Sequence, residues 1–420
     1  MPKLVNTAKD NNIPGVAVAE IDTTGQIKTS SAGVTNNSAP KAVTDQTVFE
    51  AASLSKPVFA YIVLKMVERG ELDLDMPLTK ILENKFGEGH PSAQFGPPEP
   101  GIRDHENYKK LTARMLLSHQ AGLPNEFGSP TGPPEFKFIS NAAEGFDYSG
   151  EAYRFLNEVI EKITDPKSLE EIAQEEFKKI GLEHTSFVRP ENTEDLAVGH
   201  HENGDADLRR HFYGVHPAGS LHTTAEDYGK FLKACVADEF VRKEMFKPIV
   251  QTLSGKDTKG IKQEVPREVL DQISWGLGIG LQNNSDGSMT AFHWGDGSGT
   301  CRNFAAINLS TNQAVACLTN SANGPAAFKQ LCEPVVGDLT AVSQWLSQRE
   351  NLPMKQRPSS QAQIPVESKK SIESASGRTF TPSLESQRAR SLSQEEPSTI
   401  AKGLDEHSAI TSNKEKPKRK

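Results

Sequence analysis

The 420-residue sequence predicts a mixed α/β (α+β) protein, in which an antiparallel sheet flanked by helices is interrupted by a mostly helical insertion. Two observations predict this fold class. Short strand-like segments occur near both ends of residues 1–350, and helical patterns occupy the middle. We therefore expect a sheet part at about 1–80 plus 265–350, and an insertion at about 81–264.

Local patterns predict the first strands and the first helix. Residues 13–21 are typical of a buried strand, and residues 26–32 of its hairpin partner after a polar turn. A helix is expected over 53–69, because Gly70 is a common helix stop and apolar residues recur at helical spacing. These apolar residues are Val58, Phe59, Ile62, Val63, Met66 and Val67.

The remaining elements change in character along the chain. Helices are expected at 111–119, 149–163, 168–179 and 224–236, with Gly- and Pro-rich loops at 83–108 and 125–145. After residue 274, short apolar runs separated by Gly, Asn, Asp and Ser predict an antiparallel meander. Its strands are expected at 275–281, 289–294, 303–308 and 314–319, followed by an amphipathic helix at 326–345.

Residues 351–420 differ in composition from the rest of the chain. They contain one aromatic residue, Phe380, and thirteen Ser, too little apolar surface to offset chain entropy, which predicts a disordered charged tail. The whole chain has a net charge of −8, and this tail, with 13 basic and 8 acidic residues, carries +5. Residues 1–350 therefore carry −13, which argues against nucleic acid as a partner.

The sequence also bears on location. The N-terminus lacks the apolar core of a signal peptide, and no run approaches the length of a membrane span. The four cysteines form no CxxC pair, which favours free thiols in a reducing compartment. We expect a cytoplasmic protein without a membrane span, while secretion through the C-terminal tail without a signal peptide stays open. The sequence gives no basis for predicting an oligomeric state.

Ser53-Leu54-Ser55-Lys56 is an S-x-x-K motif at the start of the predicted helix 53–69. The i, i+3 spacing puts the Ser hydroxyl and the Lys amine on one helical face, where they can exchange a proton. The positive end of the helix dipole favours a developing alkoxide, and burial disfavours the ammonium form. Taken alone, the motif also fits an ordinary helix N-cap.

Two further motifs follow in a particular order. Tyr148-Ser149-Gly150 precedes a predicted helix, and His293-Trp294-Gly295 ends a predicted strand. In this order and spacing, the three motifs resemble those of the penicillin-recognising serine hydrolases, in the branch of class C β-lactamases, D,D-peptidases and esterases. The stretches 116–124 and 217–227 are similar to that family as well, so the resemblance covers roughly 10–347. It implies a β-lactamase/D,D-peptidase-like fold.

The resemblance also implies a role for each motif residue. Ser53 would attack a carbonyl and form an acyl-enzyme, with Lys56 as its activating base. Tyr148, held near Lys56, would shuttle the proton between the nucleophile and the leaving group, or activate water later. The backbone N–H groups of Ser53 and of Asp296, which follows Gly295, would form the oxyanion hole. His293 stands where many relatives carry Lys, and would donate a hydrogen bond to a substrate carboxylate or to Tyr148, more strongly when protonated.

Two departures from the family pattern bear on the substrate. The tyrosine motif commonly ends in Asn, whose amide helps to hold the acyl side chain of the substrate, but here it ends in Gly150. The third motif, His-x-Gly, resembles D,D-peptidase and D-aminopeptidase relatives more than efficient β-lactamases. We therefore expect a serine hydrolase of peptide, amide or ester bonds, with a small molecule or peptide as substrate and without a cofactor. The sequence does not separate D,D-peptidase or D-aminopeptidase-like activity from esterase or weak β-lactamase activity. A catalytically idle relative that binds or scaffolds is the alternative.

Other candidate sites are weaker. His200 and His201, with His211 and His216 downstream, suggest a metal site, but no HExxH or Cys-His spacing supports one. A solvated loop is the favoured interpretation of these histidines. No G-x-S-x-G motif occurs, which disfavours an α/β-hydrolase triad.

Overall fold

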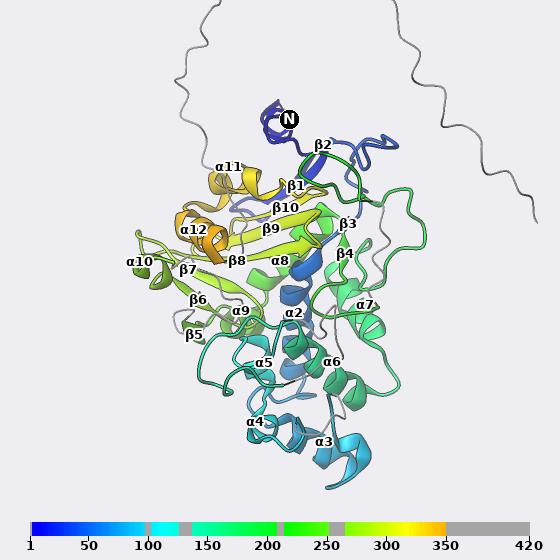
Figure 1. The fold of residues 1–420 in the computed structure, drawn as a ribbon, viewed down its shortest axis with the longest axis vertical. Coiled ribbons are helices and arrows are strands. Elements are labelled where there is room, and N and C mark those ends of the chain that lie inside the picture. Colours follow the sequence, from blue (N-terminus) through cyan, green and yellow to red (C-terminus); the bar gives the residue numbers. More distant parts are fainter. Residues whose placement is uncertain (1, 97–101, 126–136, 208–213, 252–264, 350–420) are drawn as a thin grey trace, which may run out of the picture. The chain divides into compact units, whose positions relative to one another are not determined.

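An eight-stranded antiparallel sheet forms the centre of the protein (Figure 1). The structure is a computed structural model, which describes residues 2–96, 102–125, 137–207, 214–251 and 265–349. The strand order is β2-β1-β10-β9-β8-β7-β6-β5, and β3 pairs with β4 in a separate two-stranded sheet. The strands are β1 Gly15–Ile21, β2 Ile27–Gly33, β3 Phe49–Glu50, β4 His222–Thr223, β5 Val250–Gln251, β6 Ile273–Trp275, β7 Gly280–Asn283, β8 Met289–Gly297, β9 Cys301–Asn308 and β10 Ala314–Thr319. The described residues fall within one compact unit, Met1–Pro358.

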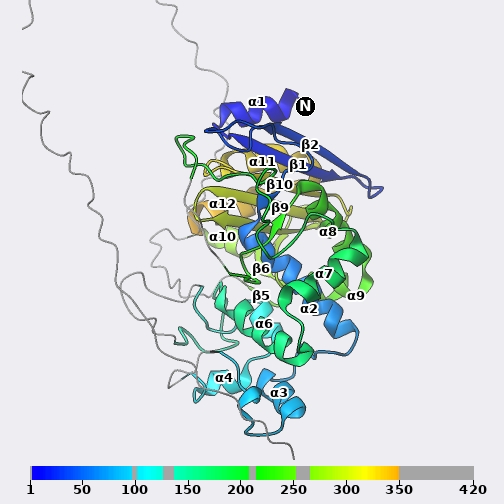
Figure 2. The same ribbon diagram turned by 90° about the vertical axis from the view of Figure 1, so that its right-hand side faces the viewer.

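Both faces of the sheet are buried, as the alternation along β1 shows. Val16 and Val18 belong to one apolar cluster, whereas Ala17 and Ala19 belong to the other. Three helices cover the first face, namely α1 Pro2–Asp10, α11 Pro325–Val336 and α12 Thr340–Arg349, and α10 Arg267–Leu270 lies beside α12 (Figures 1 and 2). The other face packs on α2 Ser55–Glu68, α8 Ala225–Ala237 and α9 Glu239–Met245.

Further helices gather around the far end of α2 (Figure 1). They are α3 Leu78–Phe86, α4 Glu106–Lys110, α5 Ala113–Leu117, α6 Glu151–Thr164 and α7 Leu169–Ile180. The start of α7 is fixed by a capping box, in which Ser168 and Glu171 each bond the other's backbone N–H. α2 runs between the sheet and this helical region, and 11 of its 14 residues are buried, which explains why its apolar residues extend around most of its circumference.

Most of the predicted elements are present, with shifts of a few residues. The expected loop 83–108 is incorrect in part, because it overlaps α3 and contains most of α4. The expected strand 275–281 is instead the hairpin β6–β7, which turns at Gly278 with a φ of 76°. The final helix breaks into α11 and α12 at Gly337, where φ is 84°. The short helices α1 and α9 were not expected.

Three elements within the predicted insertion 81–264, including α9 described above, are associated with the sheet. β5 is its edge strand, and α8 packs on β1 and β10. The predicted tail 351–420 lies outside the described residues. Within the described part of the chain, no helix is long and apolar enough to cross a membrane.

The packing of α12 on the sheet can be tested at Trp345, which is fully buried against Phe292 and Trp294 of β8. Trp345→Ala should lower the free energy of unfolding by about 3–5 kcal/mol, because it removes a large aromatic side chain from a close-packed core. Urea unfolding measures this change. Val188→Ala, at a side chain that is 45% exposed, is the control and should change stability by less than about 0.5 kcal/mol. A loss below 1 kcal/mol for Trp345→Ala would contradict the packing.

Candidate active site

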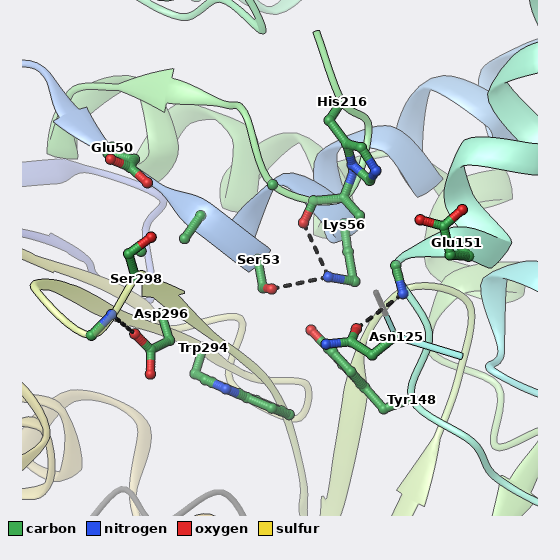
Figure 3. A pocket seen from close by; sticks show the side chains of 16 residues that line it. Glu50, Ser53, Lys56, Asn125, Tyr148, Glu151, His216, Trp294, Asp296 and Ser298 are labelled. Atoms are coloured by element: carbon green, nitrogen blue, oxygen red, sulfur yellow. Dashed lines mark hydrogen bonds between the residues drawn. The ribbon is translucent and has the colours of Figure 1, made fainter. Parts of the chain in front are cut away.

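Ser53 and Lys56 meet at the start of α2. Ser53 lies in a short 3-10 turn, η1 Ala52–Leu54, and Lys56 lies in the first turn of the helix that follows. The Lys56 Nζ donates to Ser53 Oγ at 2.9 Å and to the carbonyl oxygen of Ala218 at 3.0 Å (Figure 3). Ala52 has a φ of 50°, a left-handed conformation that is unfavourable for a residue with a Cβ and common at functional turns.

Tyr148 lies beside the same ammonium group. The Lys56 Nζ is 4.7 Å from the centre of the Tyr148 ring, within the range of a cation–π interaction. The ring stacks on Trp294 at 5.3 Å and packs on His119 at 4.5 Å. The structure thus brings Ser53, Lys56 and Tyr148 together from segments separated by more than ninety residues.

His119 holds the Tyr148 segment in place. Its side chain is fully buried, and its Nδ1 accepts a hydrogen bond from the backbone N–H of Ser149 at 3.0 Å. Its carbonyl oxygen accepts from the N–H of Asp147 at 2.8 Å. His119 was not a predicted site residue, and the only signal for it is its place within the family-like stretch 116–124.

The end of β8 forms the opposite wall. β7 pairs only with residues Met289 to Phe292 of β8, so the rest of β8 has one edge free to pack on η1. Gly295 permits this approach, because a Cβ there would overlap the carbonyl oxygen of Ala51. Asn303 of β9 adds a hydrogen bond from its Nδ2 to the carbonyl oxygen of Glu50 at 2.9 Å. Asp296, which follows Gly295 in β8, therefore lies in the same pocket as Ser53.

The charge of Asp296 is balanced within the β8–β9 hairpin. Its Oδ1 accepts from the N–H of Gly299 at 2.7 Å (Figure 3). Its Oδ2 lies 3.2 Å from the Arg302 Nε. These contacts hold the carboxylate in the turn, so its backbone remains positioned at the pocket wall.

His293 lies beneath the pocket surface. Its side chain is 1% exposed, and Trp294 lines the pocket instead. Nδ1 lies 2.7 Å from the Trp294 carbonyl oxygen, and Nε2 has no partner among the described residues. Burial, followed by the positive charge of Lys56, lowers the pKa of His293 to about 3, so the ring is neutral at ordinary pH. The expected hydrogen bond to a substrate carboxylate, strengthened by protonation, does not fit this buried neutral ring. The alternative bond to Tyr148 is made by neither ring nitrogen within the described residues.

Gly150 lines the pocket, but its surroundings leave no room for a side chain. Its N–H donates to the carbonyl oxygen of Asn125 at 3.1 Å and to the Asn125 Oδ1 at 3.0 Å (Figure 3). A Cβ at Gly150 would lie 2.6 Å from the Asn125 carbonyl oxygen. Asn125 itself lines the pocket, although no motif or pattern in the sequence pointed to it.

These residues surround a cavity of about 620 Å³, a size suited to a small molecule or a short peptide segment. Its acidic lining residues are Glu50, Glu151 and Asp296, of which Glu151 is paired with Arg154 at 2.6 Å. Lys56 is the only Lys or Arg among the described residues that line it. The described lining is Glu50, Ala52, Ser53, Lys56, Asn125, Tyr148, Gly150, Glu151, His216, Ala218, Gly219, Trp294, Asp296, Gly297, Ser298 and Gly299.

The histidines assigned to a solvated loop do not share one environment. His200 is fully buried, with Nδ1 2.9 Å from the Asn320 carbonyl oxygen and Nε2 accepting from the Asn37 N–H at 3.0 Å. His216 lines the pocket, and His211 lies outside the described residues. Only His201 is an exposed loop residue as expected. No group of three His, Cys, Asp or Glu side chains that could hold a metal occurs in the described part.

Comparison with known proteins places this chain in a family. The family model described as beta-lactamase matches residues 3–331. Penicillin-binding protein 4 of Amycolatopsis lactamdurans is 25% identical over 360 residues, which cover 79% of this chain and 87% of that protein. Esterase EstB of Burkholderia gladioli is 35% identical over 91 residues, which cover 22% and 20% of the two chains.

A solved structure shares the fold. The class C β-lactamase of Rhodobacter sphaeroides superposes with a TM-score of 0.58 at 16% identity, covering 77% of this chain and 96% of that one. The family model spans more than half of the sequence, and the shared fold agrees with it. The chain therefore belongs to the β-lactamase family of serine hydrolases.

Proposed function

We propose that this protein hydrolyses ester or amide bonds through an acyl-enzyme formed on Ser53. The observation that carries the proposal is the 2.9 Å hydrogen bond between Lys56 Nζ and Ser53 Oγ inside a pocket of about 620 Å³. A hydroxyl becomes a useful nucleophile when a base within hydrogen-bond reach can take its proton. Lys56 in its neutral form meets this condition.

The reaction would proceed in two halves. As Ser53 Oγ bonds to the substrate carbonyl carbon, its proton passes to Lys56, and the backbone N–H groups of Ser53 and Asp296 hold the oxyanion. Tyr148 beside Lys56 relays a proton to the leaving group, and the carbonyl–leaving-group bond breaks. Water then attacks the acyl-enzyme, gives its proton back through Tyr148 and Lys56, and releases the acid and the Ser53 hydroxyl.

The pocket favours a neutral ester or amide over a penicillin. Gly150 offers no side chain to an acyl amide, and His293 is buried and neutral, so it cannot act as a cation for a substrate carboxylate. Relatives named as a penicillin-binding protein and as an esterase support both peptide-like and ester substrates. We therefore propose D-aminopeptidase-like or esterase activity, and we expect D,D-peptidase activity and β-lactam hydrolysis, whose substrates carry a carboxylate, to be at most weak.

The nucleophile can be tested by covalent labelling. A fluorophosphonate should label the wild-type protein and fail to label Ser53→Ala, because only an activated Ser hydroxyl attacks the phosphorus. Intact-mass analysis measures the adduct. Ser298→Ala, which removes another hydroxyl from the same pocket, should still be labelled. Labelling of neither protein, or of wild type and Ser53→Ala alike, would favour a catalytically idle binding protein.

The proton-transfer residues can be separated from the nucleophile. Lys56→Met should lower kcat for p-nitrophenyl acetate by about 10²–10⁴-fold, because the general base is lost. Tyr148→Phe keeps the ring that stacks on Trp294 but removes the hydroxyl, and should also lower kcat at least tenfold. Steady-state kinetics with circular dichroism as a folding check measure both effects. Unchanged kcat in Tyr148→Phe would remove Tyr148 from the mechanism.

The approach of β8 to η1 can be tested at Gly295. Gly295→Ala should lower kcat by about 10²–10³-fold, because the new Cβ moves the strand and with it the Asp296 N–H of the oxyanion hole. Gly214→Ala is the control, since a Cβ there meets no atom within 4 Å. If Gly295→Ala keeps wild-type kcat, Asp296 does not supply an oxyanion donor.

A further inference from the structure

His216 lines the reaction pocket and has no part in the mechanism proposed above. It begins a tight turn, 216–220, that also includes Ala218 and Gly219 of the pocket wall. The side chain is half-buried and lies near the Lys56 ammonium (Figure 3).

Nearly every polar atom of His216 is used inside this turn. Its N–H donates to Ser220 Oγ at 2.9 Å, and its carbonyl oxygen accepts from the N–H groups of Gly219 and Ser220 at 3.2 and 3.1 Å. Its Nδ1 accepts from the N–H of Ala218 at 3.1 Å. Nε2 is the one polar atom of His216 for which the described residues provide no hydrogen-bond partner.

These contacts fix the protonation of the ring. Because Nδ1 accepts a backbone N–H, the proton of the neutral imidazole must be on Nε2. Burial, and then the positive charges of Lys56 and Arg154, lower the pKa of His216 to about 4. At neutral pH the residue therefore offers one uncharged N–H donor of defined orientation.

The turn also links His216 to the nucleophile. The Ala218 carbonyl oxygen accepts from Lys56 Nζ at 3.0 Å, so one turn positions both the imidazole and the ammonium. Figure 3 shows His216 and Tyr148 on opposite sides of the Lys56 ammonium. If Tyr148 protonates the leaving group, as the proposed function requires, the leaving group departs on the Tyr148 side. His216 then faces the acyl part that remains on Ser53.

We infer that His216 is a substrate-binding residue, which donates a hydrogen bond from Nε2 to an acceptor atom on the acyl part of the substrate. This inference rests on the proposed function and narrows its substrate class. A neutral donor is suited to a neutral acceptor, such as the carbonyl oxygen of an amide, so the preferred acyl groups are N-acylaminoacyl or peptidyl rather than plain alkanoyl.

The test compares two esters of equal acyl chain length. The p-nitrophenyl ester of N-acetylglycine carries an amide carbonyl in its acyl group, whereas p-nitrophenyl pentanoate carries none. Each is assayed with the full-length wild-type protein, His216→Phe and His216→Gln. Phe keeps a flat ring without a donor, and Gln places an amide N–H near the position of Nε2.

We expect His216→Phe to lower kcat/KM for the N-acetylglycyl ester by about fivefold to tenfold relative to the pentanoyl ester, the effect of one neutral hydrogen bond. His216→Gln should restore at least part of this ratio. Equal losses for both esters in His216→Phe would overturn the inference, because they would show that the ring only supports the turn that holds Lys56. If His216→Phe lowers kcat/KM for neither ester, the inference is overturned as well.

The same assay separates this inference from the proposed function. If the wild-type protein hydrolyses the pentanoyl ester and Ser53→Ala does not, the proposed function is supported, whatever the His216 variants show. If the wild-type protein hydrolyses neither ester, the proposed function fails and the assignment of His216 fails with it.

Discussion

The candidate active site depends on one close approach, that of β8 to the turn that precedes α2. β7 stops pairing at Phe292, which leaves an edge of β8 available to another segment. Gly295 lets that segment, at Ala51, come within a distance that a side chain would prevent. Ser53 and β8, which carries the Asp296 N–H, are therefore held together by backbone packing. The hydrogen bond from Asn303 to the Glu50 carbonyl oxygen stabilises the same contact. A rigid scaffold of this kind is what electrostatic stabilisation of an oxyanion requires.

The buried lysine is the second constraint. A charged group that is removed from water needs compensating partners. Lys56, only 2% exposed, finds them in Ser53 Oγ, the Ala218 carbonyl oxygen and the face of the Tyr148 ring. These partners belong to three separate segments of the chain. The same contacts that make the amine tolerable in the interior therefore also bring the reacting groups together.

Sequence reasoning predicted the parts of this arrangement that carry a recognisable motif. The spacing of Ser53 and Lys56 is compatible with a contact on one helical face, and β8 follows from an apolar run bounded by turn residues. The roles of Ser53, Lys56, Tyr148 and Asp296 came from the order of three motifs that resemble those of a known family. His119, Asn125 and His216 were missed because they act through contacts between distant parts of the chain. The Asn125 side chain accepts from Gly150, 25 positions away. Ala218, in the turn of His216, accepts from Lys56, 162 positions away. Helix α3 was missed for another reason, since its C-terminal turn runs into a segment whose Gly, Pro and His content indicated a loop.

The departure at Gly150 is coupled to the backbone around it. Both the carbonyl oxygen and the Oδ1 of Asn125 accept the Gly150 N–H, and the space that a Cβ would need is taken by that carbonyl oxygen. An Asn side chain at position 150 is therefore incompatible with this loop unless the loop moves. The wall at Gly150 is held by the backbone and side chain of Asn125, while the Ser53, Lys56 and Tyr148 arrangement beside it is held by separate anchors, the Ala218 carbonyl oxygen and His119. Because the two sets of anchors differ, substrate preference can change in this chain without disturbing proton transfer.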